Sequence, residues 1–437
     1  MMVHEDVICS FCGCLCDDLT VEVEENNVKR VKRACRLGAR KLMGHDRIKA
    51  PMLRQGTKLE EISYEEAYNK AAEILFKARR PLLYGWASTV CEAQKGGILL
   101  AEEVGGILDS TATVCHGPSI IGIEEIGLAG ATLGQVKNRA DLLVFWGCNP
   151  AEAHPRHTLR YSSNVCGKFT PDGRNCKKVI VVDVRETRTS KNADKFIRLL
   201  PGSDYEVISA LRMILAGKAD LLPDVIGGVS KVELISVIDL FKSAKFGAFF
   251  FGLGITHSRG RYKNIDNAIS LITELNSQTK FIMLPMRGHY NVAGIGQVAA
   301  WETGFPMSID FSRGIPYFNP GETAACDILA QQDADAALVV AADPASNLPR
   351  AIVEYLAKIP IVQIDPFENP TTLLASVVIP SAVAGIEAEG TAYRMDGMPL
   401  RMKKLVKSNY PSDEEIVYNI IKSVRELRSN AEIEGVM

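Results

Sequence analysis

Four cysteines near the N-terminus have the spacing of a metal-binding site. Cys9, Cys12 and Cys16 fall within eight residues, and Cys35 follows after eighteen more. Four thiolates can hold a 4Fe–4S cluster, and the tight spacing lets one loop supply three of its corners. A structural zinc site also uses four cysteines and is the alternative. The three residues between Cys12 and Cys16 and the long gap before Cys35 favour the cluster. Cys14 would then be a spare thiol. The cluster would transfer electrons, or it would only hold the N-terminal segment in place.

The composition is that of an ordinary globular protein from a reducing compartment. The chain has 437 residues, of which 47% are hydrophobic. A typical domain has about 150 residues, so two to four domains are expected. A formal charge of -2 gives no electrostatic case for a nucleic-acid partner. An odd count of 11 cysteines, several of them crowded, favours metal ligation over disulfides.

Two features bear on location. The apolar stretches, such as Gly247–Ile255, are too short to span a bilayer. Glu5 and Asp6 stand where a signal peptide would need Lys or Arg followed by an apolar run. We therefore expect no membrane span and a cytoplasmic location.

The chain begins with a small β-rich module and continues as α/β. Leu19–Val23 and Val28–Val31 have the pattern of two strands, and Pro51 closes the module. After it, apolar strands alternate with helices, which indicates parallel sheets covered on both faces. The expected buried strands are Pro81–Trp86, Leu142–Trp146, Val179–Val182, Ala248–Phe251, Phe281–Leu284, Ala337–Ala341 and Ile361–Ile364. A last helix, capped by Ser412 and Glu415, would pack on this chain or on a partner.

An internal echo predicts two similar nucleotide-sized halves. The run 140–150 ends in Asn149-Pro150 and is followed by a strand ending in Asp183. The run 334–344 ends in Asp343-Pro344 and is followed by a strand ending in Asp365. Each copy is a strand, a loop of small residues and a second strand ending in Asp. The alternative is that any two Rossmann-like units look this similar.

Six motifs in order resemble the molybdopterin oxidoreductase superfamily, which includes formate dehydrogenases and nitrate reductases. They are the cysteine quartet, Cys115-His116, Gly147-x-Asn149-Pro150, Asp183-x-Arg185, Pro201-Gly202-Ser203-Asp204 and Glu389-Gly390-Thr391. Within this superfamily the runs 11–18 and 389–402 are similar to the pterin-holding subunits of formylmethanofuran dehydrogenases.

The resemblance implies an α/β fold of a known organisation. An iron–sulfur domain would span 1–54, and a first Rossmann-like half would combine 55–115 with 320–400. A second half would span 116–319, and a tail with a helix 401–437. The C-terminal barrel domain of most relatives would be missing. In formylmethanofuran dehydrogenases a small barrel subunit supplies it, beside an amidohydrolase-like subunit for formyl transfer to methanofuran and a ferredoxin-like polyferredoxin subunit.

The resemblance also implies the chemistry, which is CO2 reduction to formate at a tungsten or molybdenum centre. Cys115 would ligate the metal, because a soft thiolate suits it, and the alternative is a buried cysteine acting as a small hydrophobe. His116 would bond substrate or relay a proton, and the alternative is a structural histidine. Arg287 would orient formate in bidentate fashion. His289 would support the loop.

Two molybdopterin guanine dinucleotides would lie across the two halves. The contacts expected for one are Gly147, Asn149, Pro150, Asp183, Arg185, Gly202 and Asp204, and those for the other are Gly252, Gly254, Asp343, Asn347 and Asp365. For each aspartate, a helix cap or turn is the alternative role. Formate dehydrogenases usually carry a lysine two residues after the fourth cluster cysteine. Leu37 stands there, so Arg36, Arg40 or Lys41 could bridge cluster and pterin.

Three other functions fit parts of the sequence. A stand-alone formate dehydrogenase is disfavoured by the missing barrel and by the cluster motif. A non-catalytic iron–sulfur electron-transfer scaffold would usually have lost the loop Cys115-His116-Gly117, which is intact. A zinc-bearing nucleotide-binding protein would share the β module and the α/β pattern, but it would contain no iron.

Overall fold

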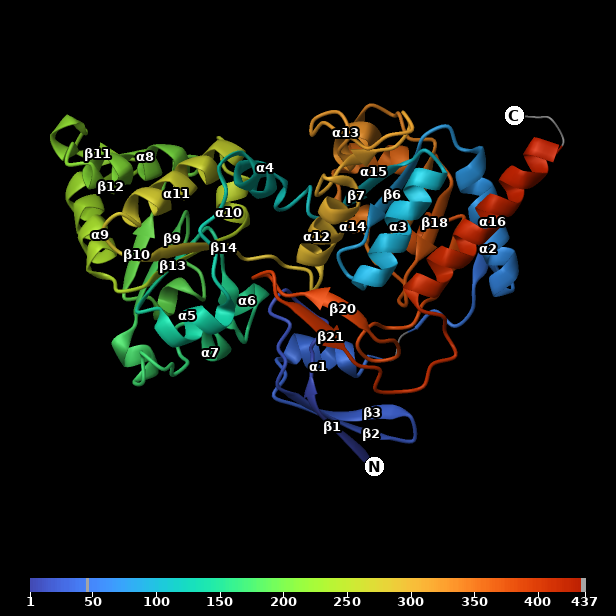
Figure 1. Ribbon diagram of the computed structural model, residues 1–437, viewed down its shortest axis with the longest axis horizontal. Coiled ribbons are helices and arrows are strands. Elements are labelled where there is room, and N and C mark those ends of the chain that lie inside the picture. Colours follow the sequence, from blue (N-terminus) through green and yellow to red (C-terminus); the bar gives the residue numbers. More distant parts are fainter. Residues whose placement is uncertain (45–46, 434–437) are drawn as a thin grey trace.

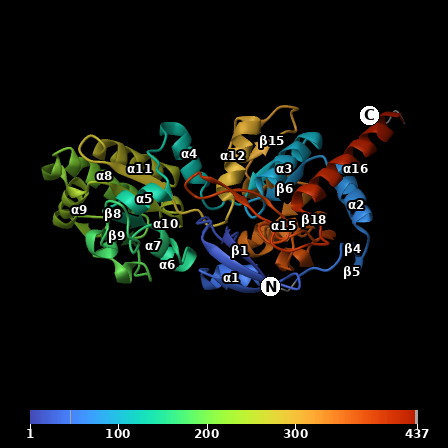
Figure 2. The ribbon, with the colours of Figure 1, turned by 60° about the horizontal axis from the view of Figure 1, so that its bottom comes forward.

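The structure is a computed structural model that describes residues 1–44 and 47–433 (Figure 1). Two lobes, each built on a largely parallel sheet, lie side by side, and a small N-terminal module lies below the junction between them. The same three bodies can be followed in Figure 2, where the N-terminal module comes forward. The expected α/β class with parallel sheets is confirmed.

The N-terminal module is a three-stranded antiparallel sheet with one helix. Its strands are β1 (Met2–Val7), β2 (Leu19–Glu24) and β3 (Asn27–Lys32), and its helix is α1 (Arg36–Leu42). Alternate side chains of β2 are buried, as the period of two in the sequence predicts. The segment between β1 and β2 carries most of the clustered cysteines and closes on itself, because the Cys9 N–H donates to the Cys16 carbonyl at 2.9 Å.

One lobe holds a five-stranded parallel sheet in the order β10-β9-β8-β13-β14. Helices cover both of its faces, because Leu142, Val144 and Trp146 of β8 point to one core and Leu143 and Phe145 to the other. The strands are β8 (Leu142–Trp146), β9 (Lys178–Asp183), β10 (Lys195–Arg198), β13 (Gly247–Phe251) and β14 (Phe281–Pro285). The main helices are α8 (Asp204–Leu215), α9 (Lys231–Ser243) and α11 (Tyr262–Leu275) on the first face and α5 (Leu133–Arg139) on the second.

The other lobe holds a nine-stranded sheet in the order β16-β15-β7-β6-β17-β18-β19-β4-β5. Its five central strands are parallel, and its edges are antiparallel. The strands are β4 (Met52–Gln55), β5 (Lys58–Glu61), β6 (Pro81–Gly85), β7 (Ile107–Ser110), β15 (Ile309–Asp310), β16 (Tyr317–Phe318), β17 (Ala336–Val340), β18 (Ile361–Ile364) and β19 (Val377–Ile379). Its larger helices are α2 (Tyr64–Lys77), α3 (Cys91–Glu103), α12 (Val292–Thr303), α13 (Ala325–Ala330), α15 (Arg350–Leu356) and α16 (Asp413–Ile433).

The expected boundary at residue 319 is wrong for the sheets. β15 and β16 lie inside the range 116–319, yet β15 pairs with β7 of the nine-stranded sheet. The helix α12 packs on α3 of the same lobe. The chain therefore leaves the five-stranded sheet directly after β14, and these short strands complete the edge of the other sheet.

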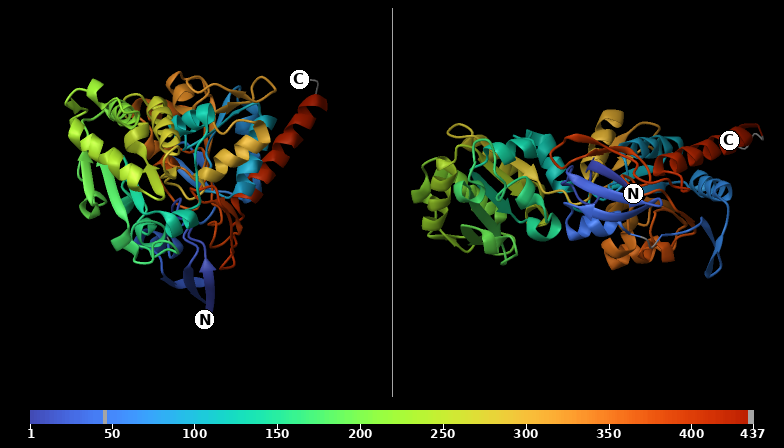
Figure 3. Two further views of the ribbon diagram at one scale, coloured as in Figure 1. Left: turned by 60° about the vertical axis from the view of Figure 1, so that its left-hand side comes forward. Right: turned by 90° about the horizontal axis from the view of Figure 1, so that it is seen from below.

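The C-terminal helix α16 packs on this chain, which is the first of the two alternatives expected from the sequence. Ser412 and Glu415 cap it reciprocally, with the Glu415 N–H donating to Ser412 Oγ at 3.1 Å. Its apolar stripe is buried against α2 and α3, and its far end points outward (Figure 3). The stripe consists of Ile416, Val417, Ile420, Ile421 and Val424.

Short elements connect these bodies. The hairpin of β20 (Gly390–Tyr393) and β21 (Pro399–Met402) lies near the junction of the lobes (Figure 1). The remaining elements are α4 (Gly117–Ile126), α6 (Pro150–Ala153), α7 (His157–Arg160), α10 (Leu253–Thr256), α14 (Pro344–Asn347), β11 (Val225–Ile226) and β12 (Val229–Ser230), besides four short 3-10 turns. Within the described residues, no helix combines the length and apolar character that crossing a membrane requires.

Candidate functional site

Cys115 lies in a tight loop between β7 and α4. The Ala112 carbonyl accepts three N–H groups, those of Cys115 at 3.0 Å, His116 at 2.6 Å and Gly117 at 2.8 Å. From the other lobe, Thr256 Oγ1 donates to the Cys115 carbonyl at 2.9 Å. The loop is therefore held from both lobes, and its thiol lies where the two sheets meet.

Arg287 follows β14 directly, at the carboxyl end of that strand, as expected from the sequence. Its carbonyl is bonded to His154 Nε2 at 2.8 Å, which fixes the backbone of this loop. Its buried Nε has no hydrogen-bond partner among the described residues. Burial raises the pKa of the Cys115 thiol to about 11, and the nearby Arg287 charge offsets part of this rise. The guanidinium and the thiol therefore lie within electrostatic reach of each other.

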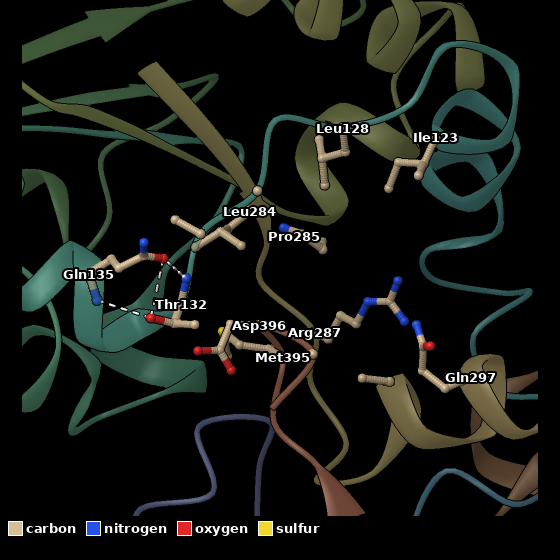
Figure 4. Close-up of a pocket in the computed structure, with 14 residues that line it drawn as sticks. Ile123, Leu128, Thr132, Gln135, Leu284, Pro285, Arg287, Gln297, Met395 and Asp396 are labelled. Carbon is tan, nitrogen blue, oxygen red and sulfur yellow. Dashed lines mark hydrogen bonds between the residues drawn. The ribbon is translucent and has the colours of Figure 1, made fainter. Parts of the chain in front are cut away.

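A cavity of about 410 Å³ opens beside Arg287 (Figure 4). The guanidinium is turned toward the side chain of Gln297 on α12, while Leu284 and Pro285 form the near wall. Met395 and Asp396 from the β20–β21 hairpin line the same cavity. A half-buried guanidinium whose buried Nε–H is unused beside a cavity fits an anionic guest such as a carboxylate.

His116 is fully buried at the start of α4. Its Nδ1 lies 3.2 Å from Ser119 Oγ, and its ring meets Phe251 edge-on. Burial lowers the pKa of His116 to about 3, and the charge of Arg287 adds to this effect. The imidazole is therefore neutral near pH 7. One of its ring nitrogens can donate a hydrogen bond and the other can accept one. All three expected catalytic side chains come together at the lobe junction.

The cysteines of the N-terminal module line one small cavity, together with Arg156. It includes the four expected ligands Cys9, Cys12, Cys16 and Cys35, and also Cys14, which is more deeply buried than any of them. Cys35 Sγ accepts the Gly38 N–H at 3.3 Å at the start of α1. Burial raises the pKa of the Cys9 and Cys16 thiols to about 12. Among residues 1–44 and 47–433, no three His, Cys, Asp or Glu side chains converge on a position for one metal ion.

Lys41 connects this module with a second cavity. Its Nζ donates to the Ser10 carbonyl at 2.7 Å, and the same side chain lines a cavity that also contains Asp365. Arg36 and Arg40, the other candidates for the bridge, have exposed side chains. Lys41 is therefore the basic residue whose position fits a link between the cysteines and a cofactor.

The cysteine loop is docked directly on the Arg287 loop. Cys12 forms a β-bridge with His289, and the Gly13 N–H donates to the Gly288 carbonyl at 2.9 Å. The Gly13 carbonyl accepts the Met395 N–H at 2.9 Å. Gly13 thus lies between the strand-end loop and the hairpin, and neither contact could be foreseen from the sequence.

We predict that Gly13→Ala destabilises the protein and disturbs the Arg287 loop. A Cβ at this position would lie 2.3 Å from the Arg287 carbonyl oxygen, so the backbone has to move. Overpacking of this kind costs about 1–3 kcal/mol. Chemical denaturation measures the loss, with Gly288→Ala as the control because a Cβ there meets nothing within 4 Å. Equal stability of the two variants would contradict the prediction.

The glycines expected to approach the cofactor meet one another. Gly147 has φ +56°, and its carbonyl accepts the Gly254 N–H at 2.9 Å. A Cβ on Gly254 would lie 2.5 Å from the Gly147 Cα, and one on Gly252 would lie 2.7 Å from the Cys148 Cβ. The assignment of Gly252 and Gly254 to the same contact set as Asp343 is therefore wrong. Because β13 is adjacent to β8, both belong with Gly147 in the five-stranded lobe.

The internal echo extends to the backbone angles and side-chain hydrogen bonds of the two copies. Asn149 precedes α6 with φ -125° and ψ 74°, and Asp343 precedes α14 with φ -127° and ψ 75°. Thr189 Oγ1 donates to Asn149 Oδ1 at 2.7 Å, and Thr371 Oγ1 donates to Asp343 Oδ1 at the same distance. Pro150 opens the one-turn helix in the first copy. The two threonines were missed, because only the folded loops bring them to the strand ends.

The strand-end aspartates differ in how many of their carboxylate oxygens are hydrogen-bonded to the protein. Asp183 is half-buried and accepts the Arg185 N–H at 3.3 Å, while the Arg185 side chain is exposed. Asp204 accepts from Trp146 Nε1 at 2.7 Å and from Ser258 Oγ. Both oxygens of Asp204 are therefore used by the protein, which fits the alternative of a structural role. Gly202 makes the turn before α8 with φ +85°.

In the second copy Asp365 is the buried member. Its Oδ1 accepts the Phe367 N–H at 2.9 Å, and burial raises the pKa of its carboxyl to about 7. Asn347 is exposed, and its Nδ2 donates to the Asp343 carbonyl at 2.8 Å, so it closes the loop. Asp365 Oδ2 also accepts from Asn369 Nδ2 at 3.3 Å, so each oxygen of Asp365 already has a partner. Asp183 accepts at Oδ1 and is the more available of the two acids at the repeated strand ends.

We predict that His157→Phe makes stability less sensitive to acid. His157 is packed against Phe145 and Phe250, and burial lowers its pKa to about 3. The pKa of a histidine in an unfolded chain is about 6.5. Below that pH the unfolded chain binds a proton at this histidine and the folded chain does not. This lowers stability by up to about 1.4 kcal/mol per pH unit as pH falls.

Denaturant titrations between pH 7 and pH 5 measure this slope. Phe fits the aromatic site and removes the titrating group, so the slope should decrease by nearly one proton. Ser162→Ala is the control, since it removes the contact to His157 Nδ1 at 3.1 Å but leaves the ring. A slope that is the same in wild type and His157→Phe would refute the prediction.

Two relatives of known name match the chain over nearly its whole length. The chain is 46% identical over 432 residues to a subunit of the tungsten-containing formylmethanofuran dehydrogenase 2 of Methanocaldococcus jannaschii, covering 97% of this chain and 99% of the relative. It is 44% identical over 435 residues to the subunit of the same name from Methanococcus maripaludis, covering 98% of this chain and 100% of the relative.

Solved structures show the same fold. A chain of the formyltransferase/hydrolase complex FhcABCD from Methylorubrum extorquens, in complex with methylofuran, superposes with a TM-score of 0.69 at 19% identity. The superposition covers 87% of this chain and 100% of that chain. The sequence model of molybdopterin oxidoreductases matches residues 47–423, which include the Cys115 loop, Arg287 and both repeated strand ends. The chain therefore belongs to the molybdopterin oxidoreductase family.

Proposed function

We propose that this protein is the catalytic subunit of a formylmethanofuran dehydrogenase, an oxidoreductase that reduces CO2 to formate for transfer to methanofuran. The observation that carries the proposal is the meeting of Cys115, His116 and Arg287 at the lobe junction. The 46% identity to a formylmethanofuran dehydrogenase subunit over nearly the whole chain supports the substrate class.

The residues present fit a pterin cofactor with a tungsten or molybdenum ion. The repeated Asn149 and Asp343 loops offer two similar sites at the strand ends of the two lobes. Orphaned buried atoms, among them Arg287 Nε, are the kind that a bound group would satisfy. Cys115 would ligate the metal, and the cofactor, when bound, supplies the two-electron redox chemistry.

The chain's own residues then have distinct tasks. CO2 takes up two electrons and one proton and becomes formate. Arg287 holds the carboxylate oxygens through paired N–H groups and so fixes the carbon beside Cys115. His116, being neutral, would hydrogen-bond the substrate through a ring nitrogen rather than carry the proton. The buried setting strengthens both contacts because water is excluded.

Electrons would enter through a 4Fe–4S cluster on Cys9, Cys12, Cys16 and Cys35. The shared cavity of these thiols supports this ligand set. Lys41 would carry the contact onward, because it joins the Ser10 carbonyl to the cavity beside Asp365. The docking of Gly13 on Gly288 keeps the cluster loop and the Arg287 loop in one register.

Other subunits would complete the reaction. The relatives are named as subunits, and the superposed chain comes from a multi-subunit complex, which supports an assembly. We propose a small barrel subunit over one pterin, an amidohydrolase-like subunit for formyl transfer and a polyferredoxin-like electron donor. We place the assembly in the cytoplasm, where thiols stay reduced, because all 11 cysteines are free.

Metal and nucleotide analysis of the anaerobically purified complex tests the proposal. We expect tungsten or molybdenum, iron, and about two guanine nucleotides per chain after acid release. Formate-dependent reduction of an artificial acceptor should accompany them. Iron without pterin or heavy metal would refute the proposal and leave a non-catalytic electron-transfer scaffold.

A further inference from the structure

The cavity beside Lys41 lies at the carboxyl edge of the nine-stranded sheet. Ser88, Ala341, Asp365 and Ala382 line it, and they follow the parallel strands β6, β17, β18 and β19 respectively. Ligands of open parallel sheets bind beyond these carboxyl ends. The volume is about 180 Å³, below the range of about 300–1,000 Å³ for whole drug-sized ligands, so it fits one part of a larger molecule.

Two carboxylates and one ammonium group face this cavity. Asp365 comes from the sheet, and Asp413 comes from the first turn of α16. Lys41 Nζ lies 4.8 Å from the centre of the Tyr290 ring on the remaining side. Among the described lining residues, acidic groups therefore outnumber basic ones.

Several of these polar atoms lack a partner. Asp413 is 6% exposed, and its Oδ2 accepts from Thr89 Oγ1 at 2.5 Å. Its Oδ1 has Ser381 Oγ as a neighbour, and neither of these two atoms has a well-formed hydrogen bond among the described residues. The Tyr290 hydroxyl is buried and likewise unpaired within those residues. Native proteins rarely leave such atoms unsatisfied, since each costs about 1–3 kcal/mol. The backbone is also strained here, because Ala341 has φ +47°.

A ligand for this cavity needs paired N–H donors facing the acids and an acceptor facing Lys41 or Tyr290. The 2-amino-4-oxopyrimidine edge has this pattern, with a ring N–H beside an amino group and a carbonyl oxygen next to them. A carboxylate accepts such a pair of donors in parallel, as it does from arginine. Both the pterin ring and guanine carry this edge.

We propose that Asp413, with Asp365, Lys41 and Tyr290, binds the 2-amino-4-oxopyrimidine edge of the cofactor. This inference rests on the proposed function and adds the C-terminal helix α16 to the cofactor-binding machinery. The helix thus has a task beyond packing, because its first residue closes the cavity opposite the sheet.

The first test measures cofactor retention in the purified complex. Asp413→Asn keeps the size of the side chain but replaces one acceptor with a donor. Guanine nucleotide and metal should leave this variant about 10- to 100-fold faster than wild type, the factor for one charge-assisted bond. Mass spectrometry of the released nucleotide over time gives the rate, and iron content should stay unchanged. Glu414→Gln is the matched control, because it makes the same kind of change on the next residue of α16, which is not among the residues that line the cavity, and it should release cofactor at the wild-type rate.

The outcomes separate the inference from the proposed function. Equal release from wild type and Asp413→Asn would overturn the inference and leave the function intact. A wild-type complex without guanine nucleotide or heavy metal would overturn the function, and the cavity would then be decided by the second test alone.

The second test identifies which end of the cofactor is bound. The full chain, produced without cofactor, is titrated with 6-hydroxymethylpterin and separately with guanosine monophosphate while its melting temperature is followed. Stabilisation by the pterin alone, lost in Asp413→Asn, assigns the pterin ring to the cavity. Stabilisation by the nucleotide alone, lost in the same variant, assigns guanine. If Asp413→Asn responds to both probes as wild type does, the inference is wrong.

Discussion

Replacing Cys115 with serine is expected to abolish formate oxidation and CO2 reduction while the chain remains folded. The change removes a soft thiolate, whose match to tungsten or molybdenum a hydroxyl does not reproduce. Substitutions that act only through a ligand's neighbours already cost about 10- to 100-fold. Loss of the ligand itself should therefore exceed about 100-fold in kcat. The assay is formate-dependent reduction of an artificial acceptor by the anaerobic complex.

Two measurements make this result specific. The melting temperature of Cys115→Ser should match wild type, because the loop is held by the backbone bonds to Ala112 and by Thr256 rather than by the thiol. Cys326→Ser is the matched control, a partly buried cysteine on α13 in the nine-stranded lobe. It should retain full activity. Full activity in Cys115→Ser would show that the thiol does not bind the metal.

The central strands could be predicted because their side chains carry the signal locally. Leu142–Trp146 and Ile361–Ile364 agree with the structure at both ends, and the other five expected strands agree within one residue, whereas β7, β10 and β19 were not among those expected. Each is an apolar run bounded by turn residues, which is typical of a strand covered on both faces. The edge strands β15 and β16 could not be predicted, because two residues carry no periodicity.

A site residue could be predicted where it closely follows a strand that the sequence itself shows. Arg287 follows a strand that the sequence shows, so its place at the carboxyl edge could be deduced. The order of strands in a sheet is not written locally, and this is why Gly252 and Gly254 were assigned to the wrong contact set. Gly13 and Asp413 were missed for the same reason, since both meet the site only after distant segments pack together.

The duplicated strand ends suggest why the site lies between the lobes. Each lobe offers the same loop, built on Asn149 in one and Asp343 in the other, with a threonine bound to it. The unique groups, Cys115 and Arg287, come from the segments where the chain passes between the lobes. A duplicated scaffold thus provides two similar cradles, and the crossings provide the chemistry.

Replacing Arg287 with lysine is expected to lower kcat/KM for formate by about 10- to 100-fold while leaving cofactor content unchanged. Lysine keeps the charge but loses the planar pair of N–H donors, and bonds to a charged group contribute about 1.5–3 kcal/mol. The main effect should fall on KM, because orientation of the carboxylate is what the guanidinium provides. Arg350→Lys on α15 is the control, since that exposed side chain pairs with Glu354 at 2.7 Å on the surface. If Arg287→Lys matched wild type in kcat/KM, carboxylate binding would have to be assigned to another group lining the cavity, of which Gln297 is the polar neighbour.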